Sequence, residues 1–306
     1  MEIYYHIDEI QKCKDSIVTV GTFDGVHLGH QAIIKELKAI PGGPSTLITF
    51  EPHPQRVLNS RRSIKILTPL EEKLQILREL GLDRVLVLRF DERIAQMPPR
   101  RFIEEIIINR IGVKEMVIGY DHAFGKGRSG HKDTLKQLGD DFGFKLRVLQ
   151  PITIEGRIVK STLIRRLLEE GRVREANRFL GRRYRLSGWV IRGEGRGKTL
   201  HFPTANIRIE EEEKLIPGDG VYAALVHLKG RPYKGILNIG FRPTFGSQER
   251  AIEVHILDFD SNIYDQRIEI EFVDKIREER KFKSPSELTI QMERDKKRGL
   301  EVLEQG

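Results

Sequence analysis

Cysteine is nearly absent from this chain, and that absence excludes several kinds of protein. Cys13 is the only cysteine among the 306 residues. A disulfide within the chain and a cysteine-based zinc cluster are therefore both excluded. No uninterrupted apolar run is long enough to cross a membrane, and residues 1–6 lack the charged and apolar regions of a secretory signal. We expect a cytoplasmic protein.

Aromatic residues are also scarce, at 7% of the chain, whereas charged residues make up 32%. Lysine and arginine total 53 against 45 acidic residues, which gives a formal net charge of +8. A basic balance suits polyanionic partners, among them nucleic acids and nucleotides. The few aromatic residues form no stacking motif of an RNA-binding module. Nucleotides are therefore the expected partners.

The length exceeds the usual span of one hydrophobic core and predicts two domains. In the first half, apolar runs alternate with segments of helical spacing, a pattern typical of a parallel sheet covered on both faces. These runs are 16–20, 45–50, 84–90, 114–119 and 145–149. In the second half, alternating runs follow one another without helices, which predicts a small antiparallel barrel or sandwich. Those runs are 184–191, 221–228, 233–239, 251–257 and 266–272.

The segment 21–30, GTFDGVHLGH, lies between a predicted strand and a predicted helix. Backbone N–H groups at a helix N-terminus favour phosphate, so this turn is a candidate phosphate site. His27 and His30 are three residues apart and would lie on one side of the first helical turn. Gly29 leaves room for the close approach of a nucleotide. A zinc pair and an ordinary surface turn are the alternatives, although no third zinc ligand stands at a fixed spacing.

The second half contains a glycine-rich segment, 193–199, that is not a P-loop. Arg192 stands where the first glycine is required, and no helix follows. The backbone N–H groups of such a loop can still surround phosphates. Further along, the two-residue period of a strand places Glu253 and His255 on one face and the apolar residues around them on the other. This pattern also fits a charge that faces solvent.

The segments 21–30 and 197–206, the latter GKTLHFPTAN, resemble those of the bifunctional riboflavin kinase/FMN adenylyltransferase family, the bacterial FAD synthetases. The resemblance runs over nearly the whole chain. It implies a Rossmann-like nucleotidyltransferase domain over 1–181. It also implies a riboflavin kinase domain over 182–306, a small antiparallel β-barrel with a terminal helix. The implied reactions are phosphorylation of riboflavin to FMN, then adenylylation of FMN to FAD and pyrophosphate, with ATP as co-substrate and Mg²⁺ for both.

The resemblance also assigns site residues. His27 and His30 are implied to be catalytic in the first domain, and Glu253 is implied to take the proton of the riboflavin 5′-hydroxyl. Thr204 and Asn206 would hold Mg²⁺, an ion that prefers hard oxygen ligands. The implied ATP and phosphate contacts are Gly21, Phe23, Asp24, Gly29, Ser161, Thr162, Arg165, Gly195, Gly197, Lys198, Thr204 and Asn206. The implied flavin contacts are Phe50, Pro52, Asp121 and Arg277.

Several of these residues have plainer explanations. Two prolines make 50–54 a stiff loop whatever it binds. Ser161 and Thr162 are suitable residues for capping a helix. A helix begins near Ser284 by its capping pattern, so the segment that follows Arg277 also serves to pack that helix on the barrel.

Three positions depart from the family pattern. Lys160 stands where the family has a serine, and His201 and Asp265 stand where it has glycine. These departures leave open a chain in which one of the two sites has decayed. A flavin- or RNA-binding regulatory protein without turnover is a further alternative. The sequence does not give the oligomeric state.

Overall fold

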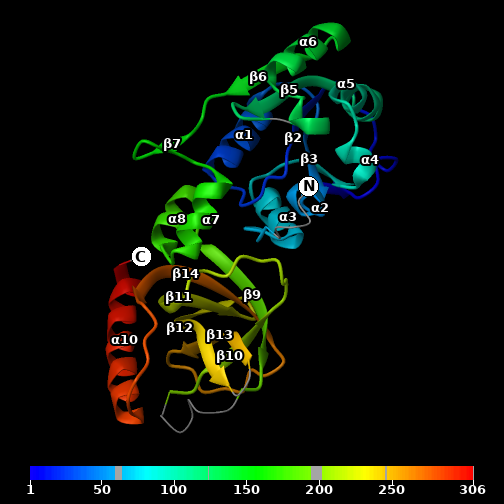
Figure 1. Cartoon of the computed structure of the whole chain (residues 1–306). Helices are drawn as coiled ribbons and strands as arrows, with labels where there is room; N and C mark the ends of the chain where they lie inside the picture. Colours follow the sequence, from blue (N-terminus) through cyan, green and yellow to red (C-terminus); the bar gives the residue numbers. More distant parts are fainter. Residues whose placement is uncertain (59–63, 123, 194–201, 245–246, 306) are drawn as a thin grey trace. The chain divides into compact units, whose positions relative to one another are not determined.

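The computed structural model describes residues 1–58, 64–122, 124–193, 202–244 and 247–305 (Figure 1). The chain divides into two compact units, Met1–Ser161 and Thr162–Gly306. We call them the α/β unit and the barrel unit.

A six-stranded sheet with the order β1-β4-β3-β2-β5-β6 is the centre of the α/β unit. All its neighbouring strands run parallel, as the sequence predicts. The strands are β1 (Glu2–Tyr4), β2 (Ser16–Val20), β3 (Ser45–Glu51), β4 (Arg84–Arg89), β5 (Val113–Gly119) and β6 (Lys145–Leu149). Alternate residues of β2 enter two separate cores, Ile17 on one side and Val18 and Val20 on the other. Both faces of the sheet are therefore covered.

Helices lie around the sheet (Figure 1) and supply many of the residues of both cores. Helices α1 (Leu28–Ala39) and α3 (Leu70–Glu79) pack with Ile17. The other core is covered by α4 (Glu92–Ala95), α5 (Pro99–Phe102), the π-helix η1 (Ile103–Ile111) and α6 (Lys132–Phe142). The unit also contains α2 (Pro54–Leu58), the short helix η2 (Lys126–Arg128) and a hairpin of β7 (Thr153–Ile154) and β8 (Arg157–Ile158).

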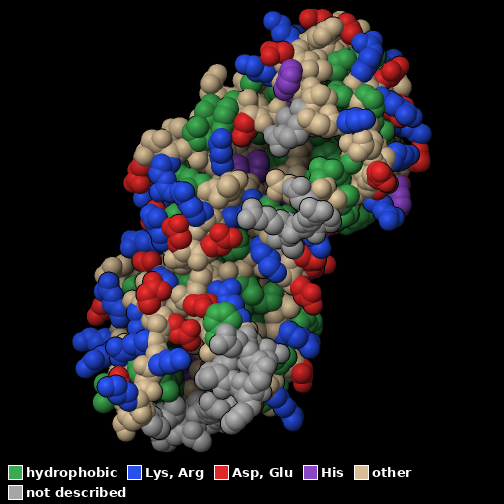
Figure 2. Space-filling model, in the orientation of Figure 1, with side chains coloured by type: hydrophobic (Ala, Val, Ile, Leu, Met, Phe, Trp, Pro, Cys, Tyr) green, Lys and Arg blue, Asp and Glu red, His purple; other side chains and the backbone are tan. Residues whose placement is uncertain are grey.

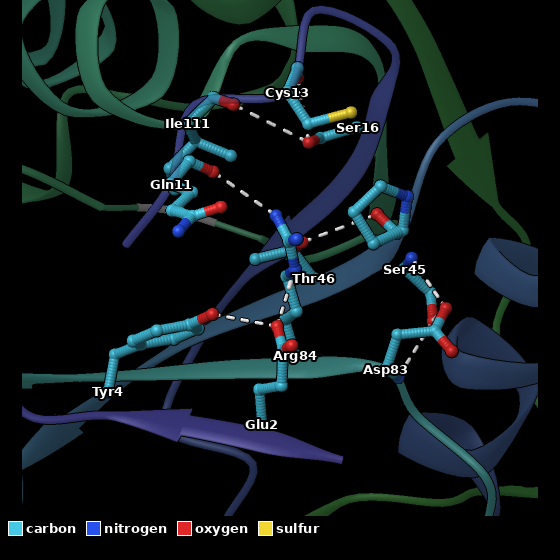
Figure 3. Close-up of polar contacts among 11 residues, drawn as sticks. Glu2, Tyr4, Gln11, Cys13, Ser16, Ser45, Thr46, Asp83, Arg84 and Ile111 are labelled. Atoms are coloured by element: carbon cyan, nitrogen blue, oxygen red, sulfur yellow. Dashed lines mark hydrogen bonds and ion pairs between the residues drawn. The ribbon is translucent and has the colours of Figure 1, made fainter. Parts of the chain in front are cut away.

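Strand β1 was not predicted, because three residues are too few to show a period. It pairs with β4 at the edge of the sheet, and side chains hold it there (Figure 3). Arg84 Nε donates to a Glu2 carboxylate oxygen at 3.0 Å, and the Tyr4 hydroxyl donates to the same oxygen at 2.7 Å. At the start of β3, the hydroxyl and the N–H of Ser45 both donate to Asp83, at 2.7 and 2.9 Å.

The barrel unit is built on a closed barrel with the strand order β10-β13-β12-β11-β14-β9. Every pair of neighbouring strands is antiparallel, as predicted. The strands are β9 (Tyr184–Ile191), β10 (Ala205–Ile209), β11 (Gly220–Leu228), β12 (Arg231–Thr244), β13 (Ser247–Ile256) and β14 (Arg267–Arg277). Alternate residues such as Leu186, Ile239 and Val254 fill the interior, so the residues between them lie on the outer face.

Two helices precede the barrel, α7 (Ser161–Glu169) and α8 (Val173–Leu180). Helix α8 is tied to the barrel by Asn177, whose amide donates to the Phe272 carbonyl at 2.8 Å and accepts from the Tyr184 N–H at 2.7 Å. The second compact unit therefore begins at Thr162, earlier than the boundary we placed between residues 181 and 182. That boundary, as a division of activities, stays a prediction.

The turn between β11 and β12 and the start of the last helix both reflect the local sequence. Lys229 and Gly230 have φ values of 50° and 78° and make the two-residue turn between β11 and β12. The next residue, Arg231, already lies in β12. Helix α10 (Pro285–Gln305) begins where predicted, and the Ser284 hydroxyl accepts from the Glu287 N–H at 3.2 Å.

None of the described helices combines the length and the apolar character that spanning a membrane requires. On the face shown in Figure 2, lysine and arginine side chains lie interspersed with acidic ones. The net positive charge is thus not gathered in one patch on that face.

Two candidate nucleotide sites

The loop between β2 and α1 adopts an unusual backbone conformation. Phe23, Gly25 and Val26 all have positive φ, at 49°, 90° and 36°. Only glycine adopts such values freely, so the backbone at Phe23 and Val26 is strained and persists only because its surroundings hold it. Their side chains are buried, at 2% and 0% exposure. The loop is therefore held by packing beneath it.

This loop delivers the two predicted histidines together. Phe23, His30 and His27 form a stack in which successive ring centroids lie 4.5 and 3.7 Å apart. His27 is the N-cap of α1, and its Nδ1 accepts the His30 N–H at 3.4 Å. Nδ1 is then an acceptor, so the proton of a neutral His27 sits on Nε2, where it can be donated. Figure 2 shows histidine side chains in a hollow on the surface of this unit.

Glycines allow the stack to form. A Cβ on Gly29 would lie 3.2 Å from the His27 ring, and a Cβ on Gly21 would lie 3.2 Å from the Phe23 ring. Both distances are tighter than ordinary packing contacts. Gly29 and Gly21, which we assigned to nucleotide binding, therefore also leave the space that the His27 and Phe23 rings occupy.

Asp24 is turned away from the surface. Its side chain is 1% exposed and accepts from the Leu67 and Thr68 N–H groups at 3.0 Å each. Its backbone carbonyl accepts the Ser161 hydroxyl at 2.8 Å. Ser161 therefore lies at the loop, as its assignment requires. Phosphate contacts by Asp24 and Ser161 stay predictions.

The predicted flavin contacts of this unit lie in different surroundings. The Phe50 ring is 7% exposed and packs edge-on to Phe90, with centroids 5.5 Å apart, so it belongs to the core. Pro52 follows it and is half-buried. Asp121 is exposed and lies 3.8 Å from the Lys160 ammonium group. The departure at position 160 therefore places a cation beside a predicted flavin contact.

Backbone pairing in the barrel brings other predicted residues into one row. Asn206 lies directly across from Glu253, and Glu253 lies directly across from Asn238. Asn238 pairs with Val221, and Val221 with Arg277. All five lie on the outer face of the barrel. Neighbouring strands are roughly 4.8 Å apart, so Glu253 and Arg277, three strands from each other, are separated by roughly 14 Å along the row.

Polar groups at the Asn206 end of this row are partly buried. Glu253, Asn206 and Thr204 are each half-buried. The Asn206 side-chain oxygen is buried and has no hydrogen-bond partner among the residues that the structure describes. An unsatisfied buried carbonyl oxygen is costly, so this oxygen is a candidate contact for a ligand.

His255 holds the segment that carries Thr204 and Asn206. Its Nδ1 lies 2.8 Å from the Pro203 carbonyl oxygen. A carbonyl only accepts, so Nδ1 is the donor and carries the proton. We noted this histidine only as a neighbour of Glu253 on one strand face, and no sequence signal showed that Pro203 would be its partner.

Arg277 has a strong partner of its own. Its guanidinium group donates to both carboxylate oxygens of Asp295 in α10, at 2.8 to 3.0 Å. It also lies 5.6 Å from the centre of the Phe282 ring. The ion pair with Asp295 fixes where the Arg277 side chain lies. Contact of Arg277 with flavin stays a prediction.

Other assignments stay predictions. Gly195, Gly197, Lys198 and the departure at His201 lie outside the described residues. Thr162 and Arg165 lie in the first turns of α7, and their phosphate contacts stay predictions.

The structure accounts for the departure at Asp265. This residue has a φ of 59°, and its N–H donates to the Val190 carbonyl at 2.9 Å. Glycine adopts that conformation freely, and aspartate is among the few other residues that tolerate it. The turn thus keeps its hydrogen bond without glycine.

The two units together define a class of protein. One is a parallel α/β sheet whose helix N-terminus presents two stacked histidines, and the other is a closed barrel with a carboxylate in a row of amide side chains. Sites of these kinds bind and transfer phosphate-containing groups.

Comparison with known proteins gives the family. The family model described as FAD synthetase matches residues 9–163, and the one described as riboflavin kinase matches residues 180–303. A bifunctional riboflavin kinase/FMN adenylyltransferase of Listeria monocytogenes is 39% identical over 92% of this chain and 90% of its own length. One of Bacillus subtilis is 37% identical over 97% of this chain and 95% of its own length.

A solved structure also matches nearly the whole chain. It is titled as a macrolide-efflux protein from Streptococcus pneumoniae, with a TM-score of 0.87 and 27% identity over 96% of this chain and 97% of that chain. The chain belongs to the bifunctional riboflavin kinase/FMN adenylyltransferase family.

Proposed function

We propose that the barrel unit phosphorylates riboflavin to FMN and that the α/β unit adenylylates FMN to FAD. Family membership supports both reactions. The single observation that carries the site assignment is the row in which Glu253 lies between Asn206 and Asn238. Those amide side chains bracket the carboxylate on a rigid sheet, a suitable setting for a positioned base.

In the kinase step, Glu253 accepts the proton of the riboflavin 5′-hydroxyl as its oxygen attacks the γ-phosphorus of ATP. The bond from that phosphorus to the bridging oxygen breaks, and ADP leaves. Asn206 orients the phosphates with its side chain, and His255 keeps the Pro203 end of the segment in place. Arg277 stands at the far end of the row, roughly 14 Å away, where it would meet the flavin ring.

Mg²⁺ fits the residues proposed to hold it in the kinase site. The buried Asn206 carbonyl oxygen, which has no partner within the described part of the chain, and the neighbouring Thr204 hydroxyl are hard oxygen donors. When bound, Mg²⁺ neutralises charge on the phosphates of ATP. The protein itself supplies the base. Glu253 takes the proton, and the pairing of β13 with β10 holds Glu253 beside Asn206.

In the adenylylation step, an oxygen of the FMN phosphate attacks the α-phosphorus of ATP, and pyrophosphate leaves. No proton has to be removed from the attacking phosphate when it is ionised, so the protein's task is to position the groups and neutralise charge. The N-terminus of α1 offers N–H groups, and His27 offers its Nε2 proton. His30 backs the His27 ring at 3.7 Å.

Separate variants test whether the two sites work independently. Glu253→Gln keeps the size of the side chain but removes the base, and should lower FMN formation by about 100-fold or more. It should leave FAD formation from supplied FMN unchanged. His27→Asn keeps a good N-cap without the imidazole. It should lower FAD formation from supplied FMN and leave FMN formation from riboflavin unchanged. Glu304→Gln, an exposed carboxylate in α10, is the control. Loss of both activities in either single variant would contradict the assignment.

A further inference from the structure

A lysine is buried under the loop that carries the adenylylation histidines. Lys73, in α3, is only 3% exposed. Burying an amino group is costly, and lysine is rarely buried completely without a partner. Burial lowers the pKa of the Lys73 ammonium group, and the nearby carboxylates of Asp24 and Glu51 oppose that shift. Lys73 exposes almost no surface to a ligand in solution, so its position needs another explanation.

Hydrogen bonds connect Lys73 to the loop. Its Nζ donates to the Thr49 hydroxyl at 3.4 Å, and that hydroxyl donates to the Thr22 carbonyl at 3.1 Å. A hydroxyl can accept one bond and donate another, so the two contacts are compatible. Thr49 is completely buried. The path runs from α3 through β3 to the residue that immediately precedes Phe23.

A second path reaches the loop through Asp24. Its carboxylate is held by the Leu67 and Thr68 N–H groups, and Lys73 supplies a nearby positive charge. The two paths thus meet the loop at Thr22 and Asp24, one on each side of Phe23. Phe23 is also a residue with positive φ, and its ring stacks on His30.

We propose that Lys73 is a positioning residue for adenylyl transfer, which acts through Thr49 and Asp24 to hold the strained 21–27 loop and so the stacked histidines. This inference rests on the proposed function of the α/β unit. A strained backbone persists only where its surroundings fix it, and a displacement of about 1 Å at a reacting centre can cost about 100-fold in rate. Lys73 supplies that fixation from below without contacting the substrates.

The stability of the protein separates this role from a purely structural one. Folding lowers the pKa of Lys73, so its contribution to stability is present above its unfolded pKa and is lost as the pH falls through its folded pKa. At neutral pH the pKa shift itself therefore lowers stability, and it gives no reason for a lysine to be kept here for stability.

The test compares Lys73→Met and Thr49→Val with Thr49→Ser and with Lys35→Met, an exposed position of α1. We expect Lys73→Met and Thr49→Val each to lower kcat for FAD formation from FMN by at least tenfold, with KM for FMN changed less than threefold. The double variant should be no slower than the slower single one, because both act on one path. Thr49→Ser keeps the hydroxyl and should retain activity, as should Lys35→Met.

Riboflavin phosphorylation in the same samples is the internal control and should change less than twofold. Wild-type FAD formation in Lys73→Met or in Thr49→Val would overturn the inference. A fall in thermal stability of Lys73→Met that accounts for its lost activity would also overturn it. Absence of FAD formation by the unaltered protein would instead refute the proposed function itself.

Discussion

The pair between Arg277 and Asp295 provides a quantitative test of how α10 is attached to the barrel. Asp295 is 3% exposed and accepts from Arg277 and from the Gln291 amide, the latter at 2.7 Å. Asp295→Asn keeps the size of the side chain but puts an NH₂ group where the guanidinium group needs an acceptor. Breaking a buried ion pair costs about 3–5 kcal/mol. Since the Arg277 side chain is 20% exposed, water recovers part of that, and we expect about 2–4 kcal/mol.

Urea unfolding followed by tryptophan fluorescence measures this cost. Trp189 is the only tryptophan and lies in β9, so the signal reports the barrel unit. With a slope of about 2 kcal/mol per molar urea, the midpoint should fall by about 1–2 M. Glu301→Gln removes an exposed pair with Arg298 on the same helix and should cost at most about 1 kcal/mol. Equal shifts in the two variants would refute the reasoning.

Three further results are expected. His255→Ala should lower riboflavin kinase activity about tenfold by releasing the Pro203 carbonyl, whereas His255→Gln, which can still donate, should lose less; equal losses would contradict this role. Glu279 is an exposed residue, yet partial desolvation of its carboxylate, and then the neighbouring Asp219, raise its pKa above 4.5. The stability that this group contributes is therefore present at low pH and lost as the pH rises through its folded pKa. Urea midpoints of Glu279→Gln should therefore fall less between pH 4 and pH 8 than those of the unaltered protein, and an identical fall would contradict the shift. Asp265→Gly should change the free energy of unfolding by less than about 1 kcal/mol, because the relief of a positive φ is offset by a more flexible unfolded chain; a larger loss in the same assay would show that the aspartate side chain is needed.

Much of the fold followed from periodicity in the sequence. Strands such as β2 and β9 have continuous or alternating apolar residues, and these patterns reflect burial on two faces or one. Strand β1 was not predicted, because its place at the sheet edge depends on pairing with β4, more than 80 residues away. Local patterns cannot report such a partner.

The sites were less predictable than the fold. His27 and His30 follow from local spacing on one helix. The alignment of Arg277 with Glu253 depends instead on the register of four strands of the closed barrel. The inward direction of Asp24 and its link to Lys73 depend on residues from three separate elements. Only tertiary packing determines those contacts.

The central claim is that one chain performs two consecutive reactions. Its most direct test is a time course of the purified protein with riboflavin, ATP and Mg²⁺, with chromatographic separation of riboflavin, FMN and FAD and assays of ADP and pyrophosphate. FMN and ADP should appear first, followed by FAD and pyrophosphate. Failure to form FMN from riboflavin, or failure to form FAD from supplied FMN, would contradict the claim.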